Sequence, residues 1–155
     1  MILGGLLVVP IGLLRAMAGQ KDAGASAPAD TLASAAAARA LVMDIERSLG
    51  FDPVDREFDK VGYDIESRVP GTGKLRFLEV KGRVSGAASI TVTKNEILYS
   101  LNKPEDYILA IVEFLGDDKH RVHYVRSPFK KEPDFGVTSV NYDFAGSIAQ
   151  AEVPR

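Results

Sequence analysis

Two segments of alternating apolar and polar residues flank a turn near the middle of the chain, and this stretch constrains the fold most strongly. Residues 62–67 and 75–81 alternate, and the loop between them contains one Pro and two Gly. Such alternation is typical of half-buried strands, and the turn residues predict a hairpin. Because side chains alternate between the two faces of a strand, Glu79 and Lys81 project from the same face.

The remaining patterns predict an α/β fold. The expected order is a helix over 31–49, strands over 62–67, 75–81 and 88–93, a helix that begins at 93–96, strands over 107–115 and 121–126, and a short helix near 144–151. Residues 51–61 are irregular and acidic, and residues 82–86 are expected to form a turn. Residues 107–115 are almost all apolar, which fits a strand buried on both faces. This order predicts an α/β sandwich, a mixed sheet flanked by helices.

A chain of 155 residues supports one domain with a sizeable core. We expect an apolar N-terminal segment and flexible linker over 1–30, the domain over 31–126 and a C-terminal extension over 127–155. The apolar run 1–17 is shorter than the ~20 residues of a membrane span, and no Lys or Arg precedes it. We therefore expect this run to be a strand or linker that packs on an upstream domain of a longer protein, and we expect a cytoplasmic location without a membrane partner. The alternative is a cleaved secretion signal, since residues 16–18 resemble a cleavage site.

Charge is distributed unevenly along the chain. The formal net charge is −2, yet residues 68–94 hold six bases and one acid, and residues 119–131 hold five bases and no acid. Two local basic stretches favour a phosphate-bearing ligand, and solvated faces are the alternative interpretation. The chain contains no Cys, which excludes disulfides, thiolate zinc sites and cysteine nucleophiles.

The spacing of four residues indicates a metal site. Asp64 lies on the first strand of the hairpin, and Glu79, Val80 and Lys81 lie on the second. Two carboxylates on adjacent strands can hold a hard cation such as Mg²⁺, with the Val80 carbonyl as a further ligand. A lysine on the same face can orient or deprotonate a water molecule. The alternative is a surface salt bridge between Glu79 and Lys81.

The segment 93–96 has the pattern of a helix-capping box. Capping alone would explain Thr93 and Glu96. Lys94 in the first turn opposes the helix dipole, whereas a helix N-terminus beside a lysine suits a phosphate. His120 and His123 are three residues apart on an expected strand, so they face opposite sides and do not form a metal pair.

Four motifs in order resemble the restriction-endonuclease-like domain of unknown function at the C-terminus of the plant NO VEIN protein, within the PD-(D/E)XK nuclease superfamily. The motifs are residues 62–67, 77–82, 93–96 and 107–109. Similar domains lie at the C-terminus of bacterial helicase-like ATPases. The resemblance covers residues 31–126 and implies a helix-strand-strand-strand-helix-strand core.

The resemblance also implies roles for individual residues. Asp64 and Glu79 match the metal ligands, and Lys81 matches the catalytic lysine. Glu46 matches an acidic position on the first helix that can join the metal site, and Glu96 matches a further family position. Tyr63 stands where the motif's name has proline, a variation that the fold often shows.

We therefore expect a nuclease domain that hydrolyses DNA with Mg²⁺ or Mn²⁺. Lys74, Arg83 and Lys94 would bind the phosphate backbone, and Thr93 and Glu96 would support the site. The resemblance implies a helicase or ATPase partner, and many such nucleases form homodimers to cut both strands. Two alternatives are a non-catalytic nucleic-acid- or protein-binding module that keeps a vestigial nuclease fold, and a secreted domain of unrelated function.

Overall fold

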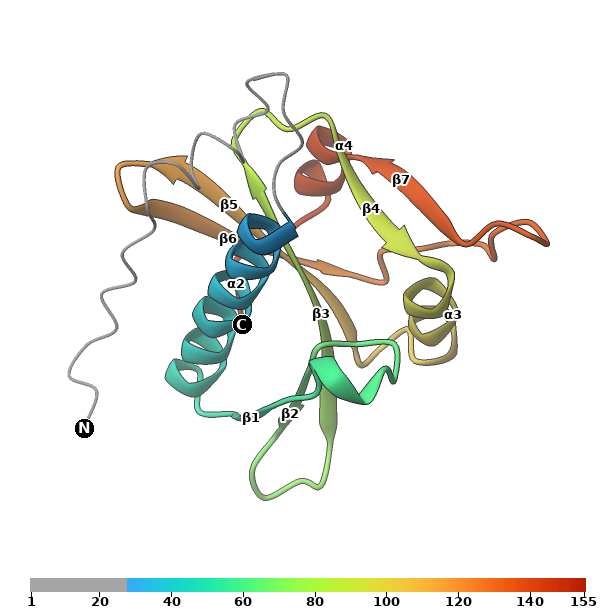
Figure 1. Cartoon of the computed structure of the whole chain (residues 1–155). Helices are drawn as coiled ribbons and strands as arrows, with labels where there is room; N and C mark the ends of the chain where they lie inside the picture. Colours follow the sequence, from blue (N-terminus) through green and yellow to red (C-terminus); the bar gives the residue numbers. More distant parts are fainter. Residues whose placement is uncertain (1–27) are drawn as a thin grey trace.

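A mixed five-stranded sheet forms the centre of the structure, a computed structural model that describes residues 28–155 (Figure 1). The elements are α2 (Pro28–Ser48), β1 (Asp52–Asp55), η1 (Glu57–Asp59), β2 (Ile65–Arg68), β3 (Leu75–Val84), β4 (Ser89–Thr93), α3 (Lys94–Asn102), β5 (Tyr107–Gly116), β6 (Lys119–Arg126), β7 (Ser139–Asp143) and α4 (Phe144–Ala149). The apolar segment 1–17 and most of the linker expected over 1–30 lie outside the described residues.

The order of strands in the sheet is β1-β2-β3-β5-β6. The predicted hairpin is confirmed, because β2 and β3 pair antiparallel with Ile65 opposite Leu78. The expected start of its first strand at residue 62 is wrong, since β2 begins at Ile65 and Asp64 precedes it. The apolar strand β5 lies parallel to β3 and antiparallel to β6, so it is buried between two neighbours. These pairings confirm the expected α/β architecture with a mixed sheet flanked by helices.

The strand expected over 88–93 forms, but it does not join the central sheet. β4 pairs with β7 in a separate two-stranded sheet. The turn expected over 82–86 is also wrong at its start, because β3 continues to Val84 along its parallel partner β5. The chain therefore turns only at residues 85–88, and β4 then leaves the sheet to cover one of its faces.

The sheet buries a different set of apolar side chains on each face. Helix α2 covers one face with Ala38 and Val42, and β4, β7, α3 and α4 cover the other (Figure 1). Gly82 permits the close approach of α2, since a Cβ there would lie 3.2 Å from the Cβ of Ala38. None of the helices within residues 28–155 is long and apolar enough to span a membrane.

Residues 127–155, expected as an extension, contribute directly to the second of these cores. Phe129 and Phe144 are buried there together with Ile90 and Ile97. Main-chain hydrogen bonds of 3.0 and 2.9 Å also join Glu152 to Tyr124 at the edge of the central sheet. The structure therefore places the C-terminal residues within the same fold as residues 31–126.

Candidate functional site

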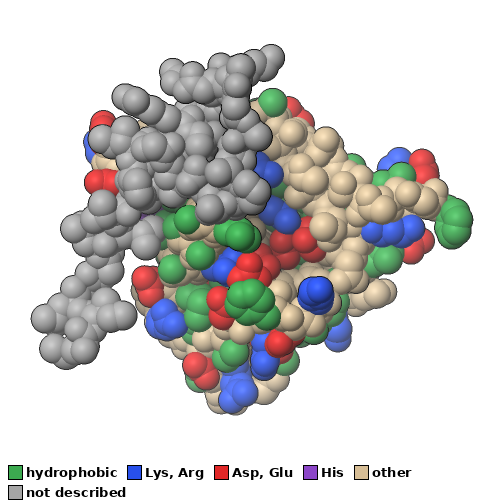
Figure 2. Space-filling view, viewed as in Figure 1, with side chains coloured by type: hydrophobic (Ala, Val, Ile, Leu, Met, Phe, Trp, Pro, Cys, Tyr) green, Lys and Arg blue, Asp and Glu red, His purple; other side chains and the backbone are tan. Residues whose placement is uncertain are grey.

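One edge of β3 is left open and forms the floor of a pocket. β2 pairs only with residues 75–78 of β3, so within the described residues Glu79–Val84 have a strand partner on one side only. Helix α2 lies on one side of this edge, and β4 and α3 lie on the other (Figure 1). The pocket lining includes Arg39, Asp64, Glu79, Lys81, Arg83 and Glu96. Figure 2 shows acidic and basic side chains gathered near the middle of this face.

Asp64 lies where the chain enters β2, and it contacts the open edge directly. Its backbone N–H donates to the carbonyl of Leu78 at 2.9 Å, and its carboxylate accepts from the N–H of Val80 at 3.0 Å. In a strand, the N–H and C=O of one residue point to the same side. The Val80 carbonyl therefore faces the same edge as the Asp64 carboxylate.

Glu79 and Lys81 point from the same face of β3, as strand alternation predicts. Lys81 Nζ lies 2.7 Å from Oε1 of Glu79 and 3.0 Å from Oε2 of Glu96. The same oxygen of Glu96 accepts the N–H of Thr93 at 2.9 Å in the capping box that begins α3. Glu96 therefore caps the helix and binds the lysine at once, so Thr93 supports the site by fixing Glu96.

Burial perturbs the ionisation of this cluster. It raises the pKa of Glu79 well above its usual range, and it also raises the pKa of Asp64. Burial alone would lower the pKa of Lys81, but the charges of Glu79 and Glu96 outweigh it and raise that pKa. The Lys81 ammonium thus lies between the carboxylates of Glu79 and Glu96, and burial favours the protonated forms of Glu79 and Asp64 when no cation is bound.

The donor groups at the open edge fit a hard divalent cation. Asp64 and Glu79 supply carboxylate oxygens and Val80 a carbonyl oxygen, the ligand type that Mg²⁺ and Mn²⁺ prefer. Within residues 28–155, no group of three or more Asp, Glu or His side chains is placed to hold a metal ion. Water and a substrate phosphate would therefore have to complete the coordination, which is usual for Mg²⁺.

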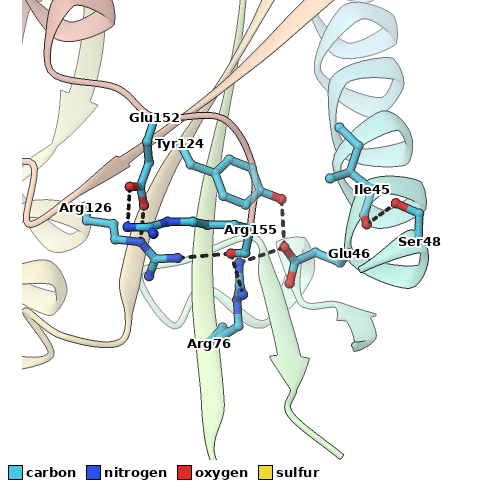
Figure 3. A network of polar contacts seen from close by, with 8 residues as sticks. All are labelled: Ile45, Glu46, Ser48, Arg76, Tyr124, Arg126, Glu152 and Arg155. Atoms are coloured by element: carbon cyan, nitrogen blue, oxygen red, sulfur yellow. Dashed lines mark hydrogen bonds and ion pairs between the residues drawn. The ribbon is translucent and has the colours of Figure 1, made fainter. Parts of the chain in front are cut away.

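The structure places Glu46 elsewhere, which corrects the expectation that it joins the metal site. Its carboxylate is fully buried between α2 and the sheet, where Oε1 lies 3.1 Å from Arg76 and accepts from the Tyr124 hydroxyl at 2.7 Å (Figure 3). Arg76 lies on the face of β3 opposite to Lys81, and its guanidinium also stacks on the Phe51 ring at 4.1 Å. A buried cation on the α2 side thus binds Glu46.

The three basic residues expected to bind phosphate occupy different positions. Arg83 lines the pocket, and its guanidinium donates to the carbonyls of Gly82 at 2.8 Å and Ser89 at 3.2 Å. Lys94 begins α3, next to residues that line an adjoining pocket. Lys74 is exposed on the hairpin loop and lines neither pocket. Arg83 and Lys94 are therefore placed near the acidic cluster, and Lys74 is not.

Sequence reasoning missed Arg39, which lines the pocket together with Lys81 and Arg83. This side chain on α2 is mostly buried and forms ion pairs with Asp55 and Glu57. Its positive charge also opposes the burial-raised pKa of Asp64. The helical spacing could have identified Arg39. It lies next to Ala38 and three residues before Val42, so it borders the apolar stripe of the helix.

Tyr107 also escaped sequence reasoning, since it begins a run of apolar residues. Its side chain is fully buried, and its hydroxyl has no hydrogen-bond partner. Burial raises the pKa of this hydroxyl well above its usual range, and the nearby charges of Glu79 and Glu96 add to the effect. The Tyr107 hydroxyl is thus a buried polar group that lies close to the carboxylates of Glu79 and Glu96.

Fold and site together define an α/β protein with an acidic pocket at an open strand edge. A family model described as protein NO VEIN, C-terminal, matches residues 35–125, which is more than half of the chain, and the chain belongs to this family. The match runs from α2 to β6 and includes Asp64, Glu79, Lys81 and Glu96. No protein with a curated description matches the chain.

Proposed function

We propose that the domain is a metal-dependent nuclease that hydrolyses phosphodiester bonds in DNA. The observation that carries the proposal is the meeting of Asp64, Glu79, the Val80 carbonyl and Lys81 at one open strand edge. Oxygen donors for a hard cation and a charged lysine at one point are what metal-assisted phosphodiester hydrolysis requires. The resemblance of the same residues to the PD-(D/E)XK motif supports this assignment.

Each residue has a defined part in this proposal. Asp64, Glu79 and the Val80 carbonyl would hold Mg²⁺ or Mn²⁺, which supplies an activated water and neutralises charge on the phosphate. The raised pKa of Lys81 keeps it charged at neutral pH. Lys81 would orient the attacking water and stabilise developing negative charge. Arg83 and Lys94 would bind neighbouring phosphates.

The partner and the setting of the reaction are also proposals. Domains that resemble this one are attached to helicase-like ATPases, so we propose that it cuts DNA presented by a helicase or other ATPase in the cytoplasm. A homodimer would bring two such sites to the two strands of a duplex.

A second candidate function is a non-catalytic binding module with a vestigial nuclease fold. It is favoured by the contacts within the protein, because the Asp64 carboxylate is bound to Val80 and Glu79 is bound to Lys81. A cation would have to compete with or share these contacts. The two candidates differ in whether DNA that binds is also cut.

A cleavage assay separates the two candidates. The full chain would be incubated with end-labelled single- and double-stranded DNA in Mg²⁺, Mn²⁺ or EDTA, beside Asp64→Asn and Lys81→Met, with Glu46→Gln as a variant outside the pocket. We expect metal-dependent cleavage that falls at least about 100-fold in the two pocket variants and not in Glu46→Gln. Cleavage that persists in both pocket variants, or that appears on no substrate, would contradict the nuclease.

A further inference from the structure

Two phenylalanines are almost completely exposed. The chain has seven Phe and five Tyr, all within the described residues, and only Phe58 and Phe135 among them are exposed. Their exposed fractions are 89% and 104%. Large aromatic side chains are normally buried because of the apolar area they remove from water. Two rings left in solvent are therefore available for contact with a ligand.

Phe58 is held at one lip of the pocket. It is the central residue of η1, and its neighbours Glu57 and Lys60 line the acidic pocket or the pocket adjoining it. Glu57 is fixed by the ion pair with Arg39 and by a 2.9 Å hydrogen bond from its N–H to Asp55. The turn is thus anchored to α2 and β1 while its aromatic ring faces solvent.

Phe135 lies in the loop beyond the N-terminus of α3, where Thr93 and Asn95 line the adjoining pocket. Its loop is closed by a 3.1 Å hydrogen bond between Val137 and Asp134, and it is fastened to α3 by a 2.8 Å bond from the Lys94 N–H to the Thr138 carbonyl. The Lys94 ammonium lies 5.8 Å from the centre of the Phe135 ring. Each exposed ring therefore has a lysine nearby, Lys60 two residues after Phe58 and Lys94 beside Phe135.

We infer that the site takes its DNA as a single strand, whose bases stack on Phe58 and Phe135 while Lys60 and Lys94 contact its phosphates. Every base offers a flat face to an aromatic ring, and this face is free in a single strand but covered in a duplex. The combination of ring and cation is typical of proteins that bind single strands without sequence preference.

The size of the pockets agrees with a ligand that extends beyond them. Their volumes are about 290 and 190 Å³, below the roughly 300–1,000 Å³ of sites that enclose a small molecule. Such a site admits part of a polymer at the open edge of β3, while the remainder lies on the surface that carries Phe58 and Phe135. This inference names the substrate class of the proposed nuclease and rests on that proposal, but its binding step can be measured without cleavage.

The test is equilibrium binding in EDTA, so that no cleavage occurs. Fluorescence anisotropy would follow labelled oligo(dT) of about 12 nucleotides, which matches the site sizes of single-strand binders, against the same strand in a duplex. The variants are Phe58→Ala and Phe135→Ala, with Phe58→Tyr as a ring that still stacks. Val153→Ala removes an 80% exposed side chain that lines neither pocket.

We expect the unchanged chain to bind the single strand more tightly than the duplex. Each Phe→Ala change should weaken single-strand binding by between about 5-fold and about 100-fold, the range that base stacking on one ring supplies. Phe58→Tyr and Val153→Ala should leave it unchanged. Equal losses for strand and duplex, no loss in either Phe→Ala variant, or tighter binding of oligo(U) than of oligo(dT) would overturn the inference.

The outcomes separate this inference from the proposed nuclease. Single-strand binding that depends on Phe58, with no cleavage in Mg²⁺ or Mn²⁺, supports the inference and removes the nuclease. Metal-dependent cleavage of duplex that is unaffected by Phe58→Ala supports the nuclease and removes the inference. A change of oligomeric state in the Phe variants, with single-strand binding intact, would show that the rings contact protein and would also overturn it.

Discussion

Lys81 Nζ lies 2.7 Å from Oε1 of Glu79, two residues earlier on the same strand. Both side chains are mostly buried, and the strand places them on the same face at the open edge of β3. The Lys81 ammonium also lies 3.0 Å from Oε2 of Glu96, so it contacts two carboxylates in the pocket. The protonation of these carboxylates and their binding of a divalent cation can both be measured in solution.

The first prediction concerns stability against pH in the absence of metal. Glu79 has an unfolded pKa near ~4.3 and a folded pKa raised well above it by burial. The folded chain therefore holds a proton that the unfolded chain releases, so stability falls as pH rises from the unfolded value through the folded value. Asp64 contributes with the same sign. The raised pKa of Lys81 acts only at alkaline pH.

Glu79→Gln removes the contribution of Glu79 and leaves that of Asp64. We expect its melting temperature in EDTA to decline less with rising pH than that of the unchanged chain. Thermal unfolding between about pH 4 and pH 8, a window that begins near the unfolded pKa of Glu, measures the difference. Parallel curves for the two proteins would mean that Glu79 is not the group that retains the proton.

The second prediction concerns the cation. Asp64 and Glu79 must lose their protons to bind Mg²⁺, so binding should release protons and strengthen as pH rises. For one displaced proton the affinity increases about tenfold per pH unit below the pKa of the group. Titration calorimetry in buffers of different ionisation enthalpy counts the protons released. The count should fall in Glu79→Gln, and an affinity that does not change with pH would argue against a site built on these carboxylates.

The third prediction separates Glu46 from the metal. Replacing one partner of a buried, hydrogen-bonded pair leaves the other charge uncompensated, so Glu46→Ala should lower the free energy of unfolding by about 3–5 kcal/mol. Asp44→Asn on the same helix removes an exposed pair with Arg47 and should cost less than about 1 kcal/mol. Urea unfolding measures both changes. The affinity of the folded Glu46→Ala protein for Mg²⁺ should be unchanged, and a loss as large as that in Asp64→Asn would return Glu46 to the site.

The fourth prediction concerns the loop that carries Asp64. Gly62 has φ +97°, and a Cβ there would lie 3.0 Å from the Cβ of Tyr99 and 3.3 Å from the carbonyl of Asn95. Gly50 has φ +89° with no atom within 4 Å of such a Cβ. Ala at either position costs about 1–2 kcal/mol for its left-handed backbone, and overpacking at Gly62 adds about 1–3 kcal/mol. Chemical unfolding should therefore show a larger loss for Gly62→Ala than for Gly50→Ala, and equal losses would mean that α3 yields to the added methyl.

The fifth prediction concerns the buried hydroxyl of Tyr107. A buried donor without a partner costs about 1–3 kcal/mol, so Tyr107→Phe should leave the free energy of unfolding unchanged or increase it. Tyr124→Phe is the matched control, because its hydroxyl donates to Glu46 at 2.7 Å and its removal should destabilise the fold. A marked loss of stability in Tyr107→Phe would reveal a partner for that hydroxyl.

Local patterns predicted the elements whose pairing follows from their own residues. Alternation identified the β2–β3 hairpin, an unbroken apolar run identified β5, and the capping box at Thr93 begins α3 as expected. β1 gave no such signal, since its four residues include Pro53 and two Asp, and it becomes a strand only by pairing with β2. The partner of β4 could not be predicted either, because β7 lies almost fifty residues later and pairing at that distance depends on the assembled fold.

The candidate site divides in the same way. Strand alternation places Glu79 and Lys81 on one face, and the hairpin brings Asp64 beside them, so these positions follow from local sequence. The position of Glu46 does not, because a helix residue at the edge of an apolar stripe can face either the pocket or the opposite side of the sheet. Glu46 faces the side away from the pocket because it pairs with Arg76, which points to the opposite face of β3 from its neighbour Phe77.

The pocket also depends on where one strand begins. β2 begins directly after Asp64. The chain before Asp64 bends away from β3 at Gly62 instead of continuing alongside it. Had residues 61–64 stayed extended, they would pair with Glu79–Gly82, and the Val80 carbonyl would be used up by the sheet. A relative of this chain could thus keep all its acidic residues and its lysine and still lose the site, simply by lengthening β2. The proposed metal site therefore depends on the length of that strand as much as on the motif residues themselves.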